Sequence, residues 1–154
     1  MKAGRLTANF TLQEMTKSQT AERLGLDNTP TEAHISSLRG VCQNVLEPLR
    51  HWTKSPVIVS SGYRSEALCE EIGSSVTSQH AKGEAVDFEV IGYDNYKVAR
   101  WIEKNLDFDQ LILEFYESGK ANSGWVHVSY KKDGQNRKQS LTFDGRSYKQ
   151  GLVK

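Results

Sequence analysis

The chain is organised around one stretch, Ser78-Gln79-His80-Ala81-Lys82-Gly83-Glu84-Ala85-Val86-Asp87. His80 and Asp87 are too far apart to lie on adjacent turns of one helix, unlike the two histidines of an HExxH helix. We therefore expect a loop ligand and a strand ligand for a metal ion, joined by a tight turn. Gly83 supplies the backbone freedom that such a turn needs.

A further histidine lies far downstream in the segment Trp125-Val126-His127-Val128-Ser129. The valines on either side of it point to the opposite face of a strand, so His127 faces away from both. Residues 85–90 also alternate as a strand should. Two paired strands can therefore place Asp87 and His127 on one side of a sheet.

Two imidazoles and one carboxylate suit a borderline cation such as zinc. Three protein ligands leave a fourth position for water, which is the catalytic rather than the structural arrangement. Taken singly, His80 could be an exposed loop residue and His127 a core residue with a satisfied ring. Their combination with Asp87, beside a loop rich in small residues, favours one zinc ion bound by all three.

The composition is that of an ordinary folded protein and excludes several classes of partner. The 154 residues suit one domain, 1–154, with a core from about residue 10 to residue 143. With 37% hydrophobic residues, 25% charged residues and a net charge of +1, nothing points to nucleic acid. No run approaches the ~20 apolar residues of a membrane span. We expect a monomer.

Two cysteines, Cys42 and Cys69, are too few for a disulfide scaffold. Cys42 falls on the apolar face of an expected helix, which favours a buried thiol, and a disulfide between the two stays open. Residues 1–11 lack the apolar core of a signal peptide. We therefore expect synthesis in the cytoplasm, with action elsewhere only after release.

The first third of the chain predicts helices. Thr11 and Glu14 form a capping box at the start of a short helix, and a second short helix covers residues 19–24. Thr29-Pro30-Thr31-Glu32 is another capping box, and the helix after it carries apolar residues with the spacing of a core-facing helix. Pro48 should kink that helix or end its regular part.

The rest of the chain interleaves strands with two helices, one over residues 66–72 and one capped by Asp94 or Asn95. The polar tail after Asp144 carries no signal. This order argues for an α+β fold with a small, mostly antiparallel sheet and the N-terminal helices packed on it. The expected strands are residues 57–60, 85–90, 111–116, 125–130 and, as an edge strand, 139–143.

Three motifs carry a resemblance to a known family. Ser-Gly-Tyr-Arg at 61–64, Ser-x-His-x-x-Gly-x-Ala-x-Asp at 78–87 and Val-His-Val at 126–128 resemble the M15 peptidases. These are zinc D-Ala-D-Ala carboxypeptidases and L-alanyl-D-glutamate endopeptidases, and the chain is most similar to their short phage and prophage members. The resemblance runs from Phe10 to about Tyr130. It implies the small α+β zinc fold shared with the hedgehog signalling domain.

The resemblance also implies that His80, Asp87 and His127 are the zinc ligands. Some family members carry an acid or a helper histidine within the three residues before the last ligand. Here residues 124–126 are glycine, tryptophan and valine, which cannot serve.

A zinc hydrolase of this type needs a carboxylate that accepts a proton from the attacking water. The candidates are Glu84, Glu89, Glu114 and Glu117. We favour Glu114, because an unpaired carboxylate in an otherwise apolar strand costs free energy on burial unless it has a functional role. In the hedgehog-like arrangement, a glutamate at such a strand end faces the zinc water. The alternative is that Glu114 points to solvent.

Four further residues are candidates around the site. Arg64 can grip a substrate carboxylate or stabilise an oxyanion, and the resemblance places it near the zinc; the alternative is a surface salt bridge. Ser78 is expected to hold His80 or its loop, unless it is a simple turn residue. Tyr63 and Trp125 either line the cleft or pack in the core. Cys69 replaces an asparagine of many relatives, which could alter a local hydrogen bond.

These features predict a zinc metallopeptidase that cleaves peptidoglycan stem peptides, either as a carboxypeptidase or as an endopeptidase. Zinc would polarise the scissile carbonyl, Glu114 would shuttle the proton and Arg64 would hold a carboxylate or the oxyanion. The expected context is a phage or prophage endolysin that reaches the cell wall after release. The alternative is a non-catalytic module of the same fold, which binds zinc for stability or serves as a binding or phage structural part.

Overall fold

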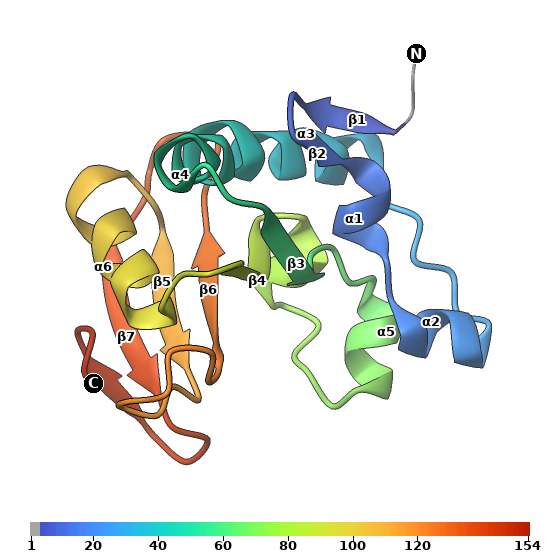
Figure 1. The fold of residues 1–154 in the computed structure, drawn as a ribbon. Helices are drawn as coiled ribbons and strands as arrows, with labels where there is room; N and C mark the ends of the chain where they lie inside the picture. Colours follow the sequence, from blue (N-terminus) through green and yellow to red (C-terminus); the bar gives the residue numbers. More distant parts are fainter. Residues whose placement is uncertain (1–3) are drawn as a thin grey trace.

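The apolar, alternating segments of the sequence form a six-stranded sheet in the computed structural model, which describes residues 4–154. The sheet has the order β3-β4-β6-β5-β7-β8, and all neighbours are antiparallel except the parallel pair β5 and β7. The expected α+β class with a mostly antiparallel sheet is confirmed (Figure 1). The strands are β3 (Val57–Ser61), β4 (Ala85–Val90), β5 (Gln110–Glu114), β6 (Trp125–Ser129), β7 (Gln139–Phe143) and β8 (Tyr148–Gln150).

Helices precede and connect these strands, and a small two-stranded sheet opens the fold. The small sheet pairs β1 (Arg5–Thr7) with β2 (Phe10–Thr11). The helical elements are α1 (Leu12–Thr16), α2 (Gln19–Leu24), α3 (Glu32–Val41), the π-helical η1 (Cys42–Leu46), α4 (Glu47–Thr53), α5 (Glu66–Glu71), the 3₁₀ helix η2 (Gln79–Lys82) and α6 (Asn95–Asn105).

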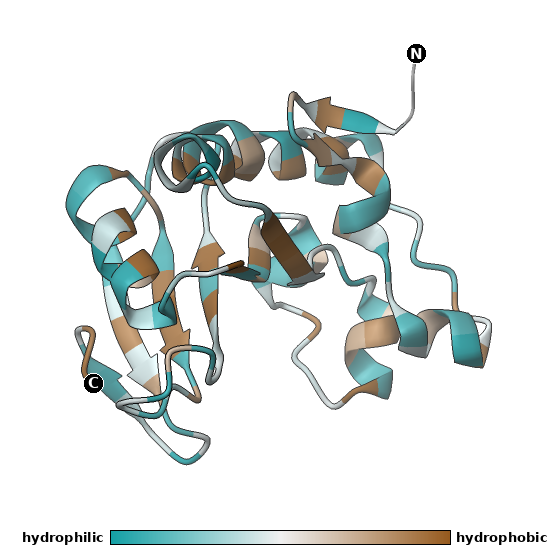
Figure 2. Cartoon of the chain, viewed as in Figure 1, coloured by the Kyte–Doolittle hydropathy of each residue, from teal (hydrophilic) through white to brown (hydrophobic). Residues whose placement is uncertain are grey.

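The two faces of the sheet have different environments because side chains alternate along each strand. One face packs against the helices α3 and α6 and forms the core. In Figure 2, brown hydrophobic and teal hydrophilic segments alternate along α3, as expected for a helix with one buried face. Core residues from the sheet include Val86, Phe88, Leu111, Leu113, Val126 and Val128.

The opposite face holds the candidate site. In the antiparallel register of β4 and β6, Asp87 is the partner of His127, so both side chains lie on the same face. His127 is in turn the partner of Ile112 in β5, two residues before Glu114. The pairing predicted for Asp87 and His127 is therefore present in the sheet.

The long N-terminal helix begins two residues later than expected. Thr11 and Glu14 do form a capping box, but the predicted box of Thr29 and Glu32 is wrong. The Thr29 hydroxyl instead donates to Asp27 Oδ1 at 2.6 Å, and Thr31 caps α3 by accepting a hydrogen bond from the His34 N–H. Thr29 is thus held by the Asp27 side chain, and the helix starts after the next available cap residue, Thr31.

Pro48 follows an interruption of the regular α-helix, in keeping with the expectation that it kinks this helix or ends its regular part. It lies in the first turn of α4, directly after the five π-helical residues of η1, and helical structure continues to Thr53. The first turn is where a missing N–H is tolerated, and a π turn absorbs the displaced hydrogen bonding before the proline.

The C-terminal half differs from expectation in two places. β5 ends at Glu114 rather than at residue 116, because Phe115 has a left-handed backbone with φ 57°. β7 is not an edge strand, because β8 pairs with its free side. β8 lies in the polar tail, where no sequence pattern predicts a strand.

Both cysteines are buried free thiols, so the open question of a Cys42–Cys69 disulfide is answered in the negative. Within residues 4–154, no helix combines the length and the apolarity needed to cross a membrane.

Candidate active site

His80 is held by the short helix η2, which the surrounding loop fixes at both ends. The Ser78 hydroxyl accepts a hydrogen bond from the His80 N–H at 3.1 Å, so Ser78 supports the loop rather than the imidazole ring. The Arg64 N–H donates to the His80 carbonyl at 3.0 Å. The Ser-Gly-Tyr-Arg segment is thereby tied to the loop that carries the candidate ligand His80.

Gly83 makes the turn that separates the loop ligand from the strand ligand. It has φ +74°, a conformation that favours glycine, and it ends η2. A Cβ atom at this position would lie 2.6 Å from the backbone oxygen of His34. The turn therefore needs glycine both for its backbone angle and for its close approach to α3.

The orientation of the His80 ring is fixed by a backbone carbonyl. His80 Nδ1 lies 2.7 Å from the Gly62 oxygen, which can only accept, so Nδ1 carries the proton. The lone pair is therefore on Nε2, which faces Asp87 Oδ1 at 3.4 Å. A hydrogen bond of this kind is how proteins orient a metal-binding histidine.

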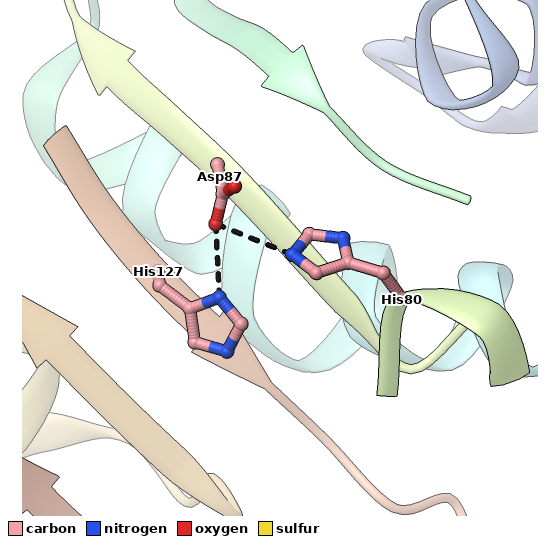
Figure 3. A group of neighbouring side chains, drawn as sticks. All are labelled: His80, Asp87 and His127. Carbon is pink, nitrogen blue, oxygen red and sulfur yellow. Dashed lines mark hydrogen bonds and ion pairs between the residues drawn. The ribbon is translucent and has the colours of Figure 1, made fainter. Parts of the chain in front are cut away.

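Asp87 lies between the two histidines. Its Oδ1 is 2.9 Å from His127 Nδ1, and the three candidate ligand atoms all lie within 4.8 Å of one another (Figure 3). Burial alone would raise the pKa of the Asp87 carboxyl, but the hydrogen bond from His127 lowers it well below its usual range. Burial lowers the pKa of His80.

This donor set fits a zinc ion. Two neutral imidazole nitrogens and one ionised carboxylate are ligands that zinc prefers, and three of them leave a position for water. Burial favours the neutral imidazole of His80, and the hydrogen bond from His127 favours the carboxylate form of Asp87. Both are the protonation states that metal binding requires.

Glu114 is the candidate base that lies in the site. Its Oε2 is 3.9 Å from His127 Nδ1, and its side chain is 17% exposed. Burial, and next the negative charge of Asp87, raise the pKa of the Glu114 carboxyl. A carboxylate with a raised pKa beside the candidate metal ligands has the property of a general base.

The other three candidate bases have different partners. Glu84 accepts a hydrogen bond from the Gln79 amide at 3.1 Å, and Glu89 accepts a long one from the Asn95 amide at 3.4 Å. Glu117 is exposed and pairs with Lys120. None of the three lines the cleft that contains Glu114.

The site opens into a cleft of about 440 Å³. Arg64 and Trp125 line it, so of the two roles left open for Trp125 the structure shows the place in the cleft. Tyr63 does not: its side chain is buried in the core, with its ring 4.7 Å from that of His34, in keeping with the core-packing interpretation. The lining residues are Arg64, Ser74, Ser78, Gln79, His80, Asp87, Gln110, Ile112, Glu114, Trp125, His127 and Tyr148.

Arg64 differs from a surface arginine. Its Nε is buried and has no hydrogen-bond partner among residues 4–154, in which Arg64 also forms no salt bridge. The Cys69 thiol lies 3.7 Å from the Arg64 carbonyl oxygen, as a weak donor. Arg64 is a residue of the cleft wall, and a guanidinium without a salt bridge there is suited to an anionic ligand.

Five residues of the cleft wall are not among the candidates from the sequence: Ser74, Gln79, Gln110, Ile112 and Tyr148. Gln110 shares its face of β5 with Glu114, so strand alternation could have found it. Tyr148 lies in β8, which neither alternation nor hydropathy indicated.

The comparisons with known proteins are consistent with this geometry. A family model described as Peptidase M15 matches residues 8–129, which is more than half of the chain and includes all three candidate ligands and Glu114. No curated protein matches the chain.

Proposed function

The chain belongs to the M15 peptidase family, and from this premise we propose that it is a zinc-dependent metallopeptidase that cleaves the stem peptides of peptidoglycan. One observation carries the proposal. His80, Asp87 and His127 converge within 4.8 Å in the wall of a cleft that also contains Glu114 and Arg64. A substrate in this cleft would thus lie near the proposed metal ligands, the proposed base and the proposed anion-binding group at the same time.

Zinc held by His80, Asp87 and His127 would supply Lewis acidity and lower the pKa of a coordinated water. The protein keeps this set ready in two ways. The Gly62 carbonyl holds the His80 ring with Nε2 toward the site. The strand register holds Asp87 opposite His127.

Glu114 accepts the proton from the attacking water and passes it to the leaving amine. Its position beside His127 and its raised pKa support this role. A base is most effective when its pKa lies near the working pH, and both burial and the charge of Asp87 move Glu114 in that direction.

Arg64 binds a carboxylate of the substrate or the oxyanion that forms during attack. Support comes from its place in the cleft wall and from the absence of a salt bridge to it within residues 4–154. Peptidoglycan stem peptides offer several carboxylates to such a group. The choice between carboxypeptidase and endopeptidase action depends on which bond Arg64 positions over the ligands.

A phage or prophage endolysin that reaches the cell wall after release is the context in which we expect this activity, and this stays a prediction. The competing hypothesis is a non-catalytic module that uses zinc for stability or binding. A purely structural site has no need for a second carboxylate, that of Glu114, beside its ligands. Burying this carboxylate costs free energy, which a structural site would not have to spend.

The test is metal depletion and replacement. Purified protein is stripped with a chelator and zinc is returned in steps, while the released amine is measured with a synthetic stem pentapeptide. The proposal predicts that activity returns in proportion to zinc and saturates at one equivalent. Variants His80→Ala and His127→Ala should retain less than one equivalent by elemental analysis, whereas His51→Ala, an exposed histidine of α4, should retain it in full. Full zinc binding without cleavage would favour the non-catalytic module.

A further inference from the structure

Four aromatic side chains form a continuous row beside the cleft. The ring of Phe115 lies 5.1 Å from that of Trp125 and 5.5 Å from that of Phe143, and Phe143 stacks on Tyr148 at 4.5 Å. We call these four residues the aromatic ledge. Phe115 is 43% exposed and Tyr148 is 59% exposed. Large aromatic side chains this exposed in one row form a surface suited to a ligand.

The strand register places the ledge on the same face as the candidate site. Glu114 is the partner of both Trp125 and Phe143, and Phe143 is the partner of Tyr148. Directly paired residues project to the same side of a sheet. In Figure 1, the ends of β5 and β7 and the start of β6 meet at the lower edge of the sheet. The ledge therefore continues outward from Glu114, and Trp125 and Tyr148 belong to the cleft wall as well.

Phe115 joins the ledge only because its backbone is left-handed. A regular strand would direct the residue after Glu114 to the other face, but φ 57° breaks that alternation. Gly145 leaves room for the ring, since a Cβ atom there would lie 2.7 Å from Phe115 Cε1. A left-handed backbone is unfavourable for a bulky residue, and such strain gathers at functional sites. Here the left-handed backbone places the exposed Phe115 ring on the ledge.

We propose that the aromatic ledge binds the glycan part of the substrate, the N-acetylhexosamine rings that carry the stem peptide. This rests on the proposed function. Stem peptides offer methyl groups, amines and carboxylates, which suit Arg64 but have no large apolar group to cover four aromatic rings. Pyranose rings present apolar C–H faces that pack flat on such rings. A cut near Glu114 would then leave the sugar end of the substrate on the ledge.

Half of the ledge lies outside the part of the chain that the family model matches. Phe115 and Trp125 fall within residues 8–129, but Phe143 and Tyr148 do not. The strand pair β7–β8 therefore adds a wall to the cleft that the matched segment lacks.

The first test measures glycan binding without turnover. The wild-type protein is titrated by calorimetry with a soluble tetramer of N-acetylglucosamine, which carries no peptide. We expect binding that is weakened about five- to tenfold in Phe143→Ala and Tyr148→Ala, the loss typical of one stacked aromatic contact. Tyr148→Phe, which keeps the ring, should bind like the wild type. Ile91→Ala, an exposed apolar residue outside the ledge, should also bind normally.

Phe115→Asn separates binding from folding. Asparagine tolerates the left-handed backbone, so the melting temperature should not fall, while tetramer affinity should fall as in the other ledge variants. Absence of tetramer binding by the wild type, or equal affinity in all variants, would overturn the proposal.

A second measurement compares cleavage of a stem peptide with cleavage of the same peptide on its disaccharide. We expect the wild type to prefer the glycan-bearing form in kcat/KM and the ledge variants to lose that preference. If neither substrate is cut, the proposed function fails, but the tetramer titration still tests the ledge. If both are cut at equal rates by the wild type, the ledge proposal alone fails.

Discussion

At the scale of single residues, the site contains two carboxylates whose pKa values are shifted in opposite directions. The hydrogen bond from His127 lowers the pKa of Asp87 despite its burial, whereas burial and the charge of Asp87 raise the pKa of Glu114. Two carboxylates with such opposite shifts suit different roles. The one that stays ionised suits a metal ligand, and the more basic one suits proton transfer. The sequence indicated both roles, Asp87 from its motif and Glu114 from its place in an apolar strand.

Replacing Glu114 tests its role as a base. Glu114→Gln removes the basic oxygen but keeps the shape, so kcat should fall by about 10²–10⁴-fold. Zinc content and melting temperature should stay close to the wild type, since Glu114 is not one of the three candidate ligands. Steady-state kinetics on a stem peptide provide the measurement. The matched control is Glu117→Gln, an exposed carboxylate of the following loop, and equal rates for both variants would contradict the role.

Asp109 supplies a prediction about pH. It is fully buried and accepts hydrogen bonds from the Arg137 guanidinium and from Gln79, the residue before His80. Burial alone would raise its pKa, but Arg137 lowers it from 3.8 to about 2. Since the folded pKa is below the unfolded one, the stabilisation is complete above pH 3.8 and is lost as the pH falls through about 2.

Asp109→Asn should therefore lower the free energy of unfolding by about 2 kcal/mol at pH 7. The loss should shrink between about pH 4 and pH 2, where the wild-type carboxylate is itself protonated. Urea denaturation at several pH values measures this. Asp107→Asn, an exposed residue of the same loop, is the control and should change stability little. A pH-independent loss would show that the ionised form of Asp109 is not what stabilises the fold.

At the scale of elements, local sequence patterns predict several helices and strands correctly. The capping box of Thr11, the helix 19–24 and the strand 85–90 depend on neighbouring residues and are present as expected. The start of α3 was misplaced because Asp27 takes the Thr29 hydroxyl, a contact that competes with capping. β8 was missed because all three of its residues are exposed and gain their strand structure from pairing with β7.

The turn at Gly83 is the element whose geometry controls the metal-ligand loop. Gly83→Ala would place a Cβ against the His34 backbone and force an unfavourable φ, so we expect a loss of stability of about 2 kcal/mol or more. Zinc affinity should fall as well, because the turn positions His80. Thermal unfolding and zinc titration measure both effects.

Gly73→Ala is the control for the backbone angle alone. Gly73 has φ +77°, but a Cβ atom added there would have no neighbour within 4 Å, so this position shares the strain without the contact. The Gly83 variant should lose more stability than this control. Equal losses would mean that the approach to α3 does not constrain the loop.

At the scale of the whole molecule, the two faces of the sheet have different roles. Its one face, under α3 and α6, forms the core, and its other face presents His127, Asp87 and Glu114 to the cleft. Because the three candidate ligands come from η2, β4 and β6, a bound ion would tie together segments far apart in the sequence. The sequence motifs identified the candidate ligands, but they could not show the outer wall built by β8.

Zinc should therefore stabilise the folded protein. An ion that binds only the folded state adds about 2.7 kcal/mol at a free concentration 100 times its Kd. We expect the melting temperature to rise with zinc in the wild type and to respond much less in Asp87→Ala. Calorimetry at several zinc concentrations checks this, and a melting temperature that is insensitive to zinc would argue against a site formed by these segments.

The most direct test of the central claim is digestion of purified peptidoglycan by the zinc-loaded protein, with the products identified by mass spectrometry and Glu114→Ala run alongside. We predict cleavage within the stem peptide by the wild type and loss of that cleavage in the variant. A new L-alanine carboxyl or D-glutamate amine would identify an endopeptidase, and loss of one terminal D-alanine a carboxypeptidase. Intact stem peptides, although zinc is bound at His80, Asp87 and His127, would contradict the claim.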